Sequence, residues 1–211
     1  STVSTGKYIA PYLLAPFIKQ HPSLDISLNV SNKNTVLQEL TGNEIDLALV
    51  SLKPELRIEE YVLMENEFVL VGAKPPVSAE VWSPDRLGSI PILFREPGSA
   101  TRQMMERYLQ QHGITVKRSL ELTSNEAIKQ SIKAGLGYSI MPKVSILPDL
   151  EQGKLFIQPV RGLPIRSQWS FIWPEGKKLS PQAQAFLDNV HEHAHEHLQR
   201  FQSKRMGTPK P

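Results

Sequence analysis

The sequence predicts an α/β protein with two Rossmann-like lobes and a hinge between them. Apolar segments alternate between the 3.6-residue period of a helix and the short β-branched runs typical of strands. The same order of helices and strands starts again after a Pro-rich break, "KPPVSAEVWSP", at 74–84. Alternation of this kind predicts parallel sheets with right-handed crossovers, and its restart predicts a second lobe.

The first fifty residues predict two helix–strand pairs. Segment 12–22 has its apolar side chains on one helical face, at Leu13, Leu14, Phe17 and Ile18, and ends at a proline. Segment 24–30, "LDISLNV", alternates in polarity and predicts a strand, and 34–40 predicts a helix. The continuous apolar run 45–50 is typical of a parallel strand that is covered on both faces.

The middle of the chain repeats this order. A strand is predicted at 67–73, before the Pro-rich break. After the break, strands are predicted at 90–94, 116–122 and 138–142, with helices at 100–112 and 124–135 between them.

The last third predicts a hairpin-like pair of strands and a long helix. The strands are 154–160 and 167–174, and the helix starts at Ser180, with Pro181 in its first turn. Strands near 69–74 and 167–172 would link the lobes, which makes the chain cross between them twice. The predicted division is 1–72 with 170–202 as lobe I, 73–169 as lobe II, and 203–211 as a flexible tail.

Composition excludes several classes of function. Without any cysteine there is no disulfide framework, thiolate metal site or cysteine nucleophile, which fits a reducing compartment. Much of the net charge of +3 comes from the tail 201–211, which holds Lys204, Arg205 and Lys210. Because Lys and Arg are not clustered on one helix or face, we expect no DNA binding by this chain alone. No apolar run approaches the length of a membrane span, and no signal peptide is recognised. We expect neither a cofactor nor membrane attachment.

The segment "LFREPGSATR" at 93–102 raises the functional question. It ends a strand, turns at Pro97-Gly98 and places Ser99 as the N-cap of the next helix. In open parallel sheets, ligands lie beyond the carboxyl ends of the strands, where helix N-termini present free amides. Ser99, Thr101 and Arg102 would then face an anion. The plainer interpretation is an ordinary capped helix with Arg102 on its surface.

Three further helix starts carry the same polar residue types. If both lobes are wound alike, all four starts face one cleft between the lobes and form a site rich in donors. Such a site favours a small anion, a carboxylate or a phosphate, with Lys7, Lys33, Arg95 and Arg102 as candidate counter-charges. The residues at the three further starts are Ser4 and Thr5, then Asn32, Asn34 and Thr35, then Asn125 and Thr123, the last forming a capping box with Glu126.

The order of motifs resembles the C-terminal effector-binding domain of LysR-type transcriptional regulators, over nearly the whole chain. The matching segments are "YIAPYLLAPFIKQHPSLDISL", "NEIDLALV", "REPGSATR", "SNEAIKQSIKAGLGYSIMP" and "LSPQAQAFLDNV". "VSTGKYIAP", "NKNTVLQEL" and "REPGSATR" are most similar to the branch that regulates carbon-fixation (RuBisCO) operons.

The resemblance implies a bilobed fold of the type II periplasmic-binding-protein kind. It also implies a cytoplasmic sensor that responds to phosphorylated metabolites of the Calvin cycle or to nicotinamide nucleotides. A homodimer is implied, and a tetramer for the full-length form, with DNA bound only through an N-terminal helix-turn-helix that this chain lacks. Most of the family's first strand would lie just upstream of "STVSTG". The implied effector contacts come from Ser4 and Thr5, from Thr35, from Ser99, Thr101 and Arg102, and from 123–125.

Two other classes of function remain open at this point. A periplasmic solute-binding protein shares the bilobed plan and would serve transport. The enzyme alternative is weaker. A bilobed dehydratase that acts on prephenate needs a Thr-Arg-aromatic arrangement, whereas Thr101-Arg102 is followed by Gln103 here, and a bilobed porphyrin-precursor synthase needs a cysteine. No Ser-His-Asp order is convincing either. The run "HEHAHEH" at 191–197 has histidines at i,i+4 spacing, but the alternating glutamates favour a solvated helix face over a metal site.

Overall fold

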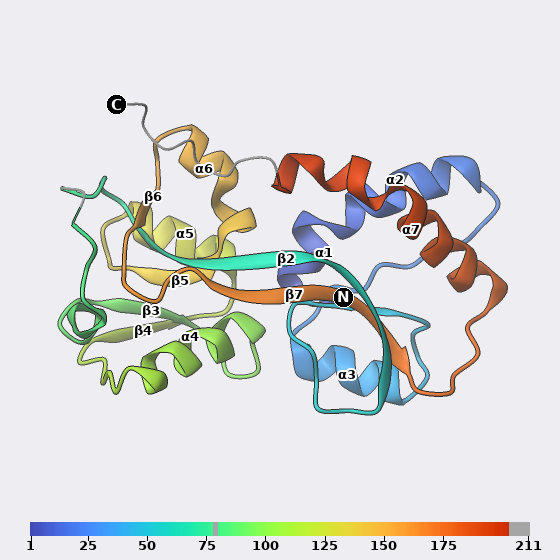
Figure 1. Cartoon of the computed structure of the whole chain (residues 1–211), viewed down its shortest axis with the longest axis horizontal. Coiled ribbons are helices and arrows are strands. Elements are labelled where there is room, and N and C mark those ends of the chain that lie inside the picture. Colours follow the sequence, from blue (N-terminus) through green and yellow to red (C-terminus); the bar gives the residue numbers. More distant parts are fainter. Residues whose placement is uncertain (78–79, 203–211) are drawn as a thin grey trace. The chain divides into compact units, whose positions relative to one another are not determined.

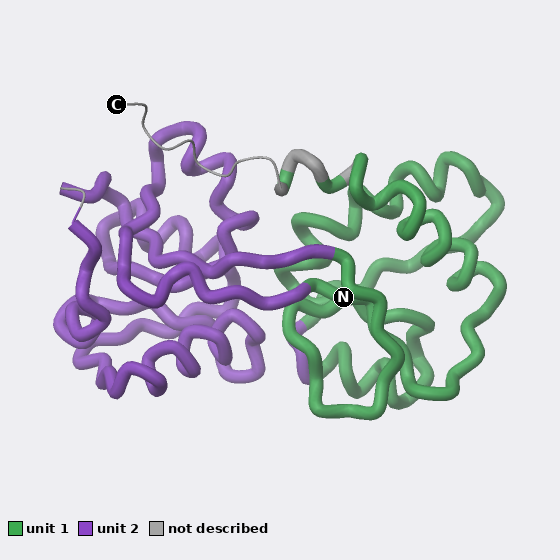
Figure 2. The backbone as a smooth tube through the Cα atoms, viewed as in Figure 1, with its two compact units in different colours: residues 1–31, 35–63, 169–211 green, residues 32–34, 64–168 purple. Residues whose placement is uncertain are grey.

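A computed structural model describes residues 1–77 and 80–202 (Figure 1). The chain is mixed α/β, as predicted, and divides into two compact units (Figure 2). Unit 1 contains 1–31, 35–63 and 169–211, and unit 2 contains 32–34 and 64–168. The predicted tail, 203–211, lies outside the described residues.

The predicted helices form within a few residues of their expected bounds. The α-helices are α1 (Val3–Tyr8), α2 (Ala10–Gln20), α3 (Lys33–Thr41), α4 (Ala100–Gln111), α5 (Asn125–Lys133), α6 (Leu147–Glu151) and α7 (Pro181–Gln202), and the 3₁₀ turns are η1 (Pro84–Gly88) and η2 (Lys143–Ile146). The strands are β1 (Ala48–Val50), β2 (Ile58–Gly72), β3 (Ile92–Arg95), β4 (Ser119–Leu122), β5 (Ser139–Pro142), β6 (Phe156–Gln158) and β7 (Ile165–Pro174). Among the described residues, no helix is both long and apolar enough to cross a membrane.

Unit 1 is built around β1 and the part of β7 that pairs with it. The pair is antiparallel, with Ala48 opposite Ile172. The inner face of α3, with Val36 and Leu40, packs against these strands. Helices α2 and α7 contribute a separate aromatic contact, in which the rings of Phe17 and Phe186 lie 5.3 Å apart. Periodic apolar side chains thus bury α3 against the strands.

The strand predicted at 24–30 does not form as a regular strand. Only Ser31, just after it, forms an isolated parallel bridge, to Thr2. Leu28 and Val30 stay 39% and 40% exposed, although their alternation suits a strand. The alternation marks which side chains share a face, but a strand also needs a hydrogen-bonded neighbour.

Unit 2 contains the parallel pair that the sequence predicts. Strands β3 and β4 are parallel, and Ile92 forms a parallel bridge to Tyr138 at the start of β5. Figure 1 shows α4 and α5 on opposite sides of β3 and β4. On the α5 side, Ile128 and Ile132 pack with Leu93 in a core of fully buried side chains. This half of the chain therefore has the expected crossover architecture.

A buried acid ties α5 to α6. The Asp149 carboxylate lies 3.3 Å from Lys129 Nζ and also pairs with Lys133. Asp149 and Lys129 are 7% and 9% exposed. Charges this little exposed are tolerated because they are paired.

The predicted hairpin of 154–160 with 167–174 is wrong. Strand β6 pairs with β2, placing Ile157 opposite Val71, whereas β7 lies between β1 and β2. The 15-residue strand β2 supplies the partner for both. Its length lets it contribute residues to both units, as does β7 (Figure 2).

The start of the last helix is confirmed. Ser180 Oγ accepts a hydrogen bond from Ala183 N at 3.2 Å, and Pro181 occupies the first helical position. The first N–H groups of a helix have no acceptor within the helix. The Ser180 hydroxyl accepts from one of them, and the proline at the first helical position has no N–H that needs an acceptor.

Candidate functional site

The candidate site of unit 2 lies where β3 and β4 end. The parallel register places Arg95 opposite Leu122, so both strands finish at the same edge of the sheet. Helix α4 begins five residues after β3 ends, at Ala100, and α5 begins three residues after β4 ends, at Asn125. The first amides of both helices, which lack intrahelical acceptors, are therefore close to this edge.

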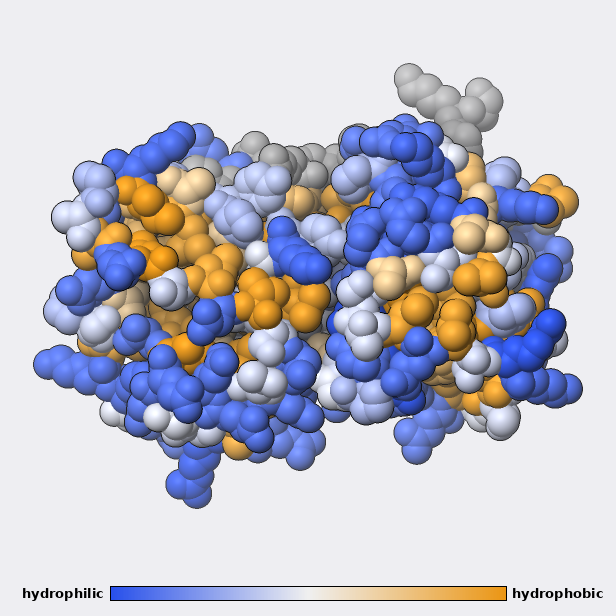
Figure 3. Space-filling view, turned by 180° about the vertical axis from the view of Figure 1, so that it is seen from behind, coloured by the Kyte–Doolittle hydropathy of each residue, from blue (hydrophilic) through white to orange (hydrophobic). Residues whose placement is uncertain are grey.

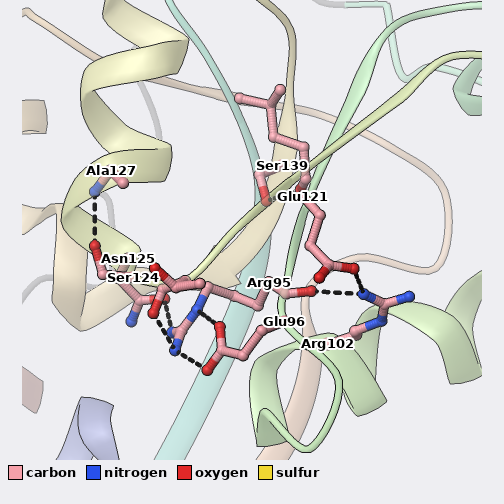
Figure 4. Close-up of polar contacts among 10 residues, drawn as sticks. Arg95, Glu96, Arg102, Glu121, Ser124, Asn125, Ala127 and Ser139 are labelled. Carbon is pink, nitrogen blue, oxygen red and sulfur yellow. Dashed lines mark hydrogen bonds and ion pairs between the residues drawn. The ribbon is translucent and has the colours of Figure 1, made fainter.

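A buried arginine occupies the edge between the two helix starts (Figure 4). Arg95 is 2% exposed. Its Nε and Nη2 each donate to one carboxylate oxygen of Glu96, both at 2.7 Å. Its Nη1 donates to Asn125 Oδ1 at 2.6 Å, and Nη2 also reaches Thr123 O at 3.4 Å. One guanidinium thus links the end of β3 to the start of α5.

The pairing with Glu96 determines what this arginine is able to do. A forked guanidinium–carboxylate pair is directional and charge-assisted, and it compensates the cost of burying the cation. Glu96 itself is 20% exposed, so it lies at the rim of the cluster. Because Glu96 balances its charge, Arg95 mainly stabilises the conformation of this edge of the sheet. Recognition of an anion here would depend on hydroxyls and amides as well.

Two hydroxyl side chains at the start of α4 are buried without capping it. Ser99 is the N-cap residue, as predicted, and it is 7% exposed, but its side chain makes no capping hydrogen bond. Thr101 is 3% exposed. The first turn of α4 is closed by the backbone instead, since Gln103 N donates to Ser99 O at 3.0 Å.

The capping box predicted at Thr123 and Glu126 is wrong by one residue. Ser124 is the N-cap of α5, and its Oγ accepts from Ala127 N at 3.1 Å. The exposed Glu126 pairs with Lys129 at 2.8 Å instead. Thr123 therefore lies in the loop before the cap, where its carbonyl faces Arg95 at 3.4 Å. Asn125, 1% exposed, remains at the start of α5 as expected.

Arg102 lies in a different environment from Arg95. Its Nε donates to Glu106 at 2.7 Å. Its Nη1 donates to Glu121 at 2.5 Å and to Arg95 O at 2.9 Å (Figure 4). The hydrogen bond to Glu106, with a second to Glu121, raises the pKa of Arg102 above its ordinary value against the opposing effect of burial. Its charge is therefore balanced by two carboxylates.

This second arginine lines a groove between α4 and β4. The groove has a volume of about 640 Å³, and its apolar walls include Phe94, Leu109 and Leu120. Hydrophobic side chains also interrupt the polar surface elsewhere, as Figure 3 shows for one face of the molecule.

The start of α3 contributes two residues to the neighbourhood of α4. Residues 32–34 cluster with unit 2. Lys33 Nζ donates to Gln103 Oε1 at 3.2 Å, and a Cβ added at Gly98 would lie 3.2 Å from Asn34 Nδ2. Gly98 has φ of +86°, a conformation that suits glycine, so the turn before Ser99 can lie close to Asn34.

The remaining predicted residues belong to unit 1. Ser4 and Thr5 were expected just before the first helix but lie inside α1, because Gly6 N donates to Thr2 O at 2.8 Å and closes the first turn earlier. Thr5 is fully buried, and its Oγ1 lies 2.9 Å from Leu49 O, which fastens α1 to β1.

Thr35 and Lys7 differ from these buried hydroxyls. Thr35 lies in the first turn of α3 and is half-buried, whereas Lys7 is exposed. Thr35 agrees with the predicted helix start, whereas Lys7 lies in the last turn of α1.

The described structure therefore groups the predicted residues by unit. Unit 2 brings together the largest set, and unit 1 holds the other three. Sequence reasoning missed the partners Glu96, Glu106, Glu121 and Ser124. All but Glu121 had a local signal: Glu96 is adjacent to Arg95, Glu106 is four residues after Arg102 on one helix, and Ser124 is an N-cap residue type directly before α5. The unit 2 set is Asn34, Arg95, Ser99, Thr101, Arg102, Thr123 and Asn125, and the unit 1 set is Ser4, Thr5 and Thr35.

Two of the histidines of α7 contact an aromatic ring and a backbone carbonyl. His191 stacks edge-on against Tyr61, with ring centroids 5.7 Å apart, and His193 Nδ1 lies 3.1 Å from Asn189 O. In the part of the chain that the structure describes, no three His, Cys, Asp or Glu side chains are grouped to hold a metal ion.

Sequence comparison relates this chain to regulators of transcription. The family model described as "LysR substrate binding domain" matches residues 1–195. The RuBisCO operon transcriptional regulator of Acidithiobacillus ferrooxidans is 36% identical over 191 residues, which are 89% of this chain and 62% of that relative. The transcriptional activator CmpR of Synechocystis sp. is 35% identical over 196 residues, 92% of this chain and 64% of CmpR. The chain thus spans less than two thirds of the length of these relatives.

Structure comparison gives the same relationship. The Synechocystis PCC6803 CcmR regulatory domain, solved in complex with 2-PG, has a TM-score of 0.84 and 30% sequence identity, and the match covers 97% of this chain and 96% of that one. The effector-binding domain of QuiR, solved with shikimate, has a TM-score of 0.78 at 20% identity, covering 93% of this chain and 95% of QuiR's, and supports the fold alone.

Proposed function

The chain belongs to the family of LysR substrate-binding domains, and from this premise we propose that it is the effector-sensing domain of a LysR-type transcriptional regulator. Its effector is a small anionic metabolite that carries a phosphate or a carboxylate. Binding of this metabolite controls DNA binding by the longer protein, through a DNA-binding domain outside this chain. The proposal includes a cytoplasmic location, a homodimer, a tetramer for the longer form, and no catalytic activity.

The observation that carries the proposal is the pair of adjacent helix starts beside Arg95. Ser99 and Thr101 are buried hydroxyls near the start of α4, and Ser99 spends no hydrogen bond on capping. Asn125 stands at the start of α5, oriented by Arg95. Helix N-termini favour anions through their free amides and their dipoles, so these groups suit one carboxylate or phosphate.

We extend the site to unit 1 as part of the same proposal. Ser4 and Thr5 lie inside the first turn of α1, and Thr35 lies in the first turn of α3. A metabolite held by both units would favour one arrangement of the units, which is the thermodynamic requirement for a ligand-driven switch. Strands β2 and β7, which both run from one unit into the other, are the proposed hinge. The predicted lobes, 1–72 with 170–202 and 73–169, stay a prediction.

The names of the relatives favour regulation over the two alternatives. The curated relatives are named transcriptional regulators, and none of those described above is a transport protein or an enzyme. The ligand of the CcmR domain supports an anion such as 2-PG as the first candidate for this chain.

A thermal-shift screen tests the proposal. The chain is heated with 2-PG, sugar phosphates, 2-oxoglutarate or shikimate, with a neutral sugar as the matched control. At 100 times Kd, ligand binding contributes about 2.7 kcal/mol, which raises the Tm of a domain of this size by roughly 5–10 °C. No shift with any anion at millimolar concentration would contradict the proposal.

Two variants separate the one-unit site from the two-unit site. If the anion contacts both units, Thr35→Val and Ser99→Ala each weaken its binding, as measured by calorimetry. If Ser99→Ala alone weakens binding, the anion site stays in unit 2 and its extension to unit 1 is wrong.

A further inference from the structure

The guanidinium of Arg95 has almost no donor left for a ligand. A guanidinium carries five N–H bonds and no acceptor. Nε and Nη2 donate to Glu96, Nη1 donates to Asn125 Oδ1 (Figure 4), and Nη2 also donates to Thr123 O. These contacts use four of the five N–H bonds, and the side chain is only 2% exposed. An anion therefore cannot receive from Arg95 the two parallel bonds that an arginine usually gives to a carboxylate or a phosphate.

The same contact fixes the orientation of the Asn125 side-chain amide. Because a guanidinium only donates, the amide atom 2.6 Å from Arg95 Nη1 is the oxygen. The amide nitrogen Nδ2, with its two N–H bonds, then points in another direction. Reversing the amide would place donors against donors, and Asn125 is only 1% exposed, so water would not replace the lost bond. Toward any other partner, the Nδ2 end of Asn125 is therefore a donor.

Asn125 is not needed to cap its helix. Ser124 is the N-cap of α5, and its hydroxyl accepts from Ala127 N at 3.1 Å. Asn125 occupies the first helical position, close to the edge where β3 and β4 both end. Helix α4, with the buried hydroxyls of Ser99 and Thr101, begins near the same edge. A buried amide that presents donors here adds to the hydroxyl groups of the candidate anion site.

We propose that Arg95 is a positioning residue of the effector site, which acts on the anion only by turning Asn125 Nδ2 toward it. The inference rests on the proposed function, because it concerns the same site. It assigns Arg95 a different role from the direct counter-charge that the sequence suggests. It also gives the site a polarity, in which the ligand atom beside Asn125 is an oxygen that only accepts, as in a carboxylate or an ionised phosphate. A ligand ammonium group in that place would face donors instead of an acceptor.

Asn125→Asp tests the polarity at Asn125. The carboxylate has the size of the amide and still offers Arg95 an oxygen, so this variant should melt no lower than the unaltered chain. It replaces the two N–H donors by a charged acceptor, so calorimetry should show a Kd for 2-PG at least about 100-fold higher. The matched control is Gln130→Glu, which makes the same change of charge on an exposed side chain of the same helix and should change the Kd less than about threefold.

A double-mutant cycle tests whether Arg95 acts through Asn125. Arg95→Lys keeps a cation beside Glu96, but one ammonium replaces the fork and cannot hold Glu96 and Asn125 in fixed geometry. Arg95→Lys and Asn125→Ala should each raise the Kd for 2-PG by about tenfold, the size of one lost hydrogen bond. The double variant should bind like Asn125→Ala alone, because the amide that Arg95 orients is then absent. If Arg95 contacted the anion itself, or only stabilised the edge of the sheet, the two effects would multiply to about 100-fold.

Multiplying effects in the cycle would overturn the proposal, and so would a Kd for Asn125→Asp as low as that for Gln130→Glu. A marked loss of Tm in Asn125→Asp would overturn it as well, because Oδ1 would then not be the atom that faces Arg95. If Arg95→Lys does not fold, Asn125→Asp and its control decide alone. Failure of the proposed function is a different result, in which the unaltered chain binds no anion in the thermal-shift screen, and this inference would fall with it.

Discussion

Replacing Ser99 by Ala tests whether its hydroxyl binds the ligand or stabilises helix α4. Ser99 is 7% exposed and occupies the N-cap of α4, but its side chain makes no capping bond. Its removal should therefore cost little of the free energy of unfolding. If the hydroxyl binds the anion, the lost hydrogen bond involves a charged partner and is worth about 1.5–3 kcal/mol. The Kd for 2-PG should then rise by about 10- to 150-fold.

The matched control is Ser180→Ala, because Ser180 is the N-cap of α7 in unit 1 and does cap its helix. Ser180 Oγ accepts from Ala183 N at 3.2 Å. Losing a cap of this kind costs about 1 kcal/mol, so this variant should melt roughly 2–4 °C lower, with no change in Kd. Both variants lose a serine hydroxyl, but Ser99→Ala should weaken ligand binding, whereas Ser180→Ala should lower stability.

Titration calorimetry with 2-PG and scanning calorimetry measure the two effects. The reasoning fails if Ser99→Ala binds 2-PG as tightly as the unaltered chain. It also fails if Ser99→Ala loses as much stability as Ser180→Ala, because the hydroxyl would then act as a cap.

Three further predictions concern contacts within one unit that stabilise its fold. Glu96→Gln removes the charge that balances buried Arg95 and should cost about 1–3 kcal/mol in urea unfolding, whereas Glu106→Gln, at an exposed ion pair, should cost less than about 1 kcal/mol; equal losses would contradict the burial argument. Burial alone would raise the pKa of Asp149, but the two α5 lysines that contact it hold that pKa below its ordinary value of about 4. Because the folded pKa is depressed, this stabilisation is present above pH 4 and is lost as pH falls through the folded pKa, so Asp149→Asn should flatten the stability change between pH 5 and pH 3. Thr5→Val removes a fully buried hydroxyl that bonds to the carbonyl of β1 and should lower the free energy of unfolding by about 1–3 kcal/mol, and an unchanged urea midpoint would show that this bond does not stabilise α1.

Much of the fold can be predicted from local patterns. Helices α4 and α5 bury the apolar side chains that their periodicity selects, such as Met104 and Tyr108 in α4 or Ile128 in α5. The parallel pairing of β3 with β4 also follows from the order of the elements, because an intervening helix leaves little other choice.

Predictions that depend on a partner elsewhere in the chain were less accurate. Segment 24–30 carries the alternation of a strand, yet it forms no ladder, since alternation does not supply a neighbour. The predicted hairpin failed for the same reason, because β2 offers a longer partner to both strands. The capping box failed by one residue, because it is the hydroxyl of Ser124, not that of Thr123, that accepts from the amide three residues on.

In the candidate site, too, the residue types follow from local sequence, whereas some of the contacts depend on partners elsewhere in the chain. The sequence alone determined that hydroxyl and amide side chains stand at the starts of α3, α4 and α5, since caps follow from neighbours in the chain. Only the tertiary structure decided that Arg95 is buried against Asn125 and that Arg102 also pairs with Glu121. Helix periods, caps and the pairs of each arginine with Glu96 or Glu106 are set within a few residues, whereas burial and the longer-range contacts depend on which distant side chains the packed fold brings within hydrogen-bonding distance.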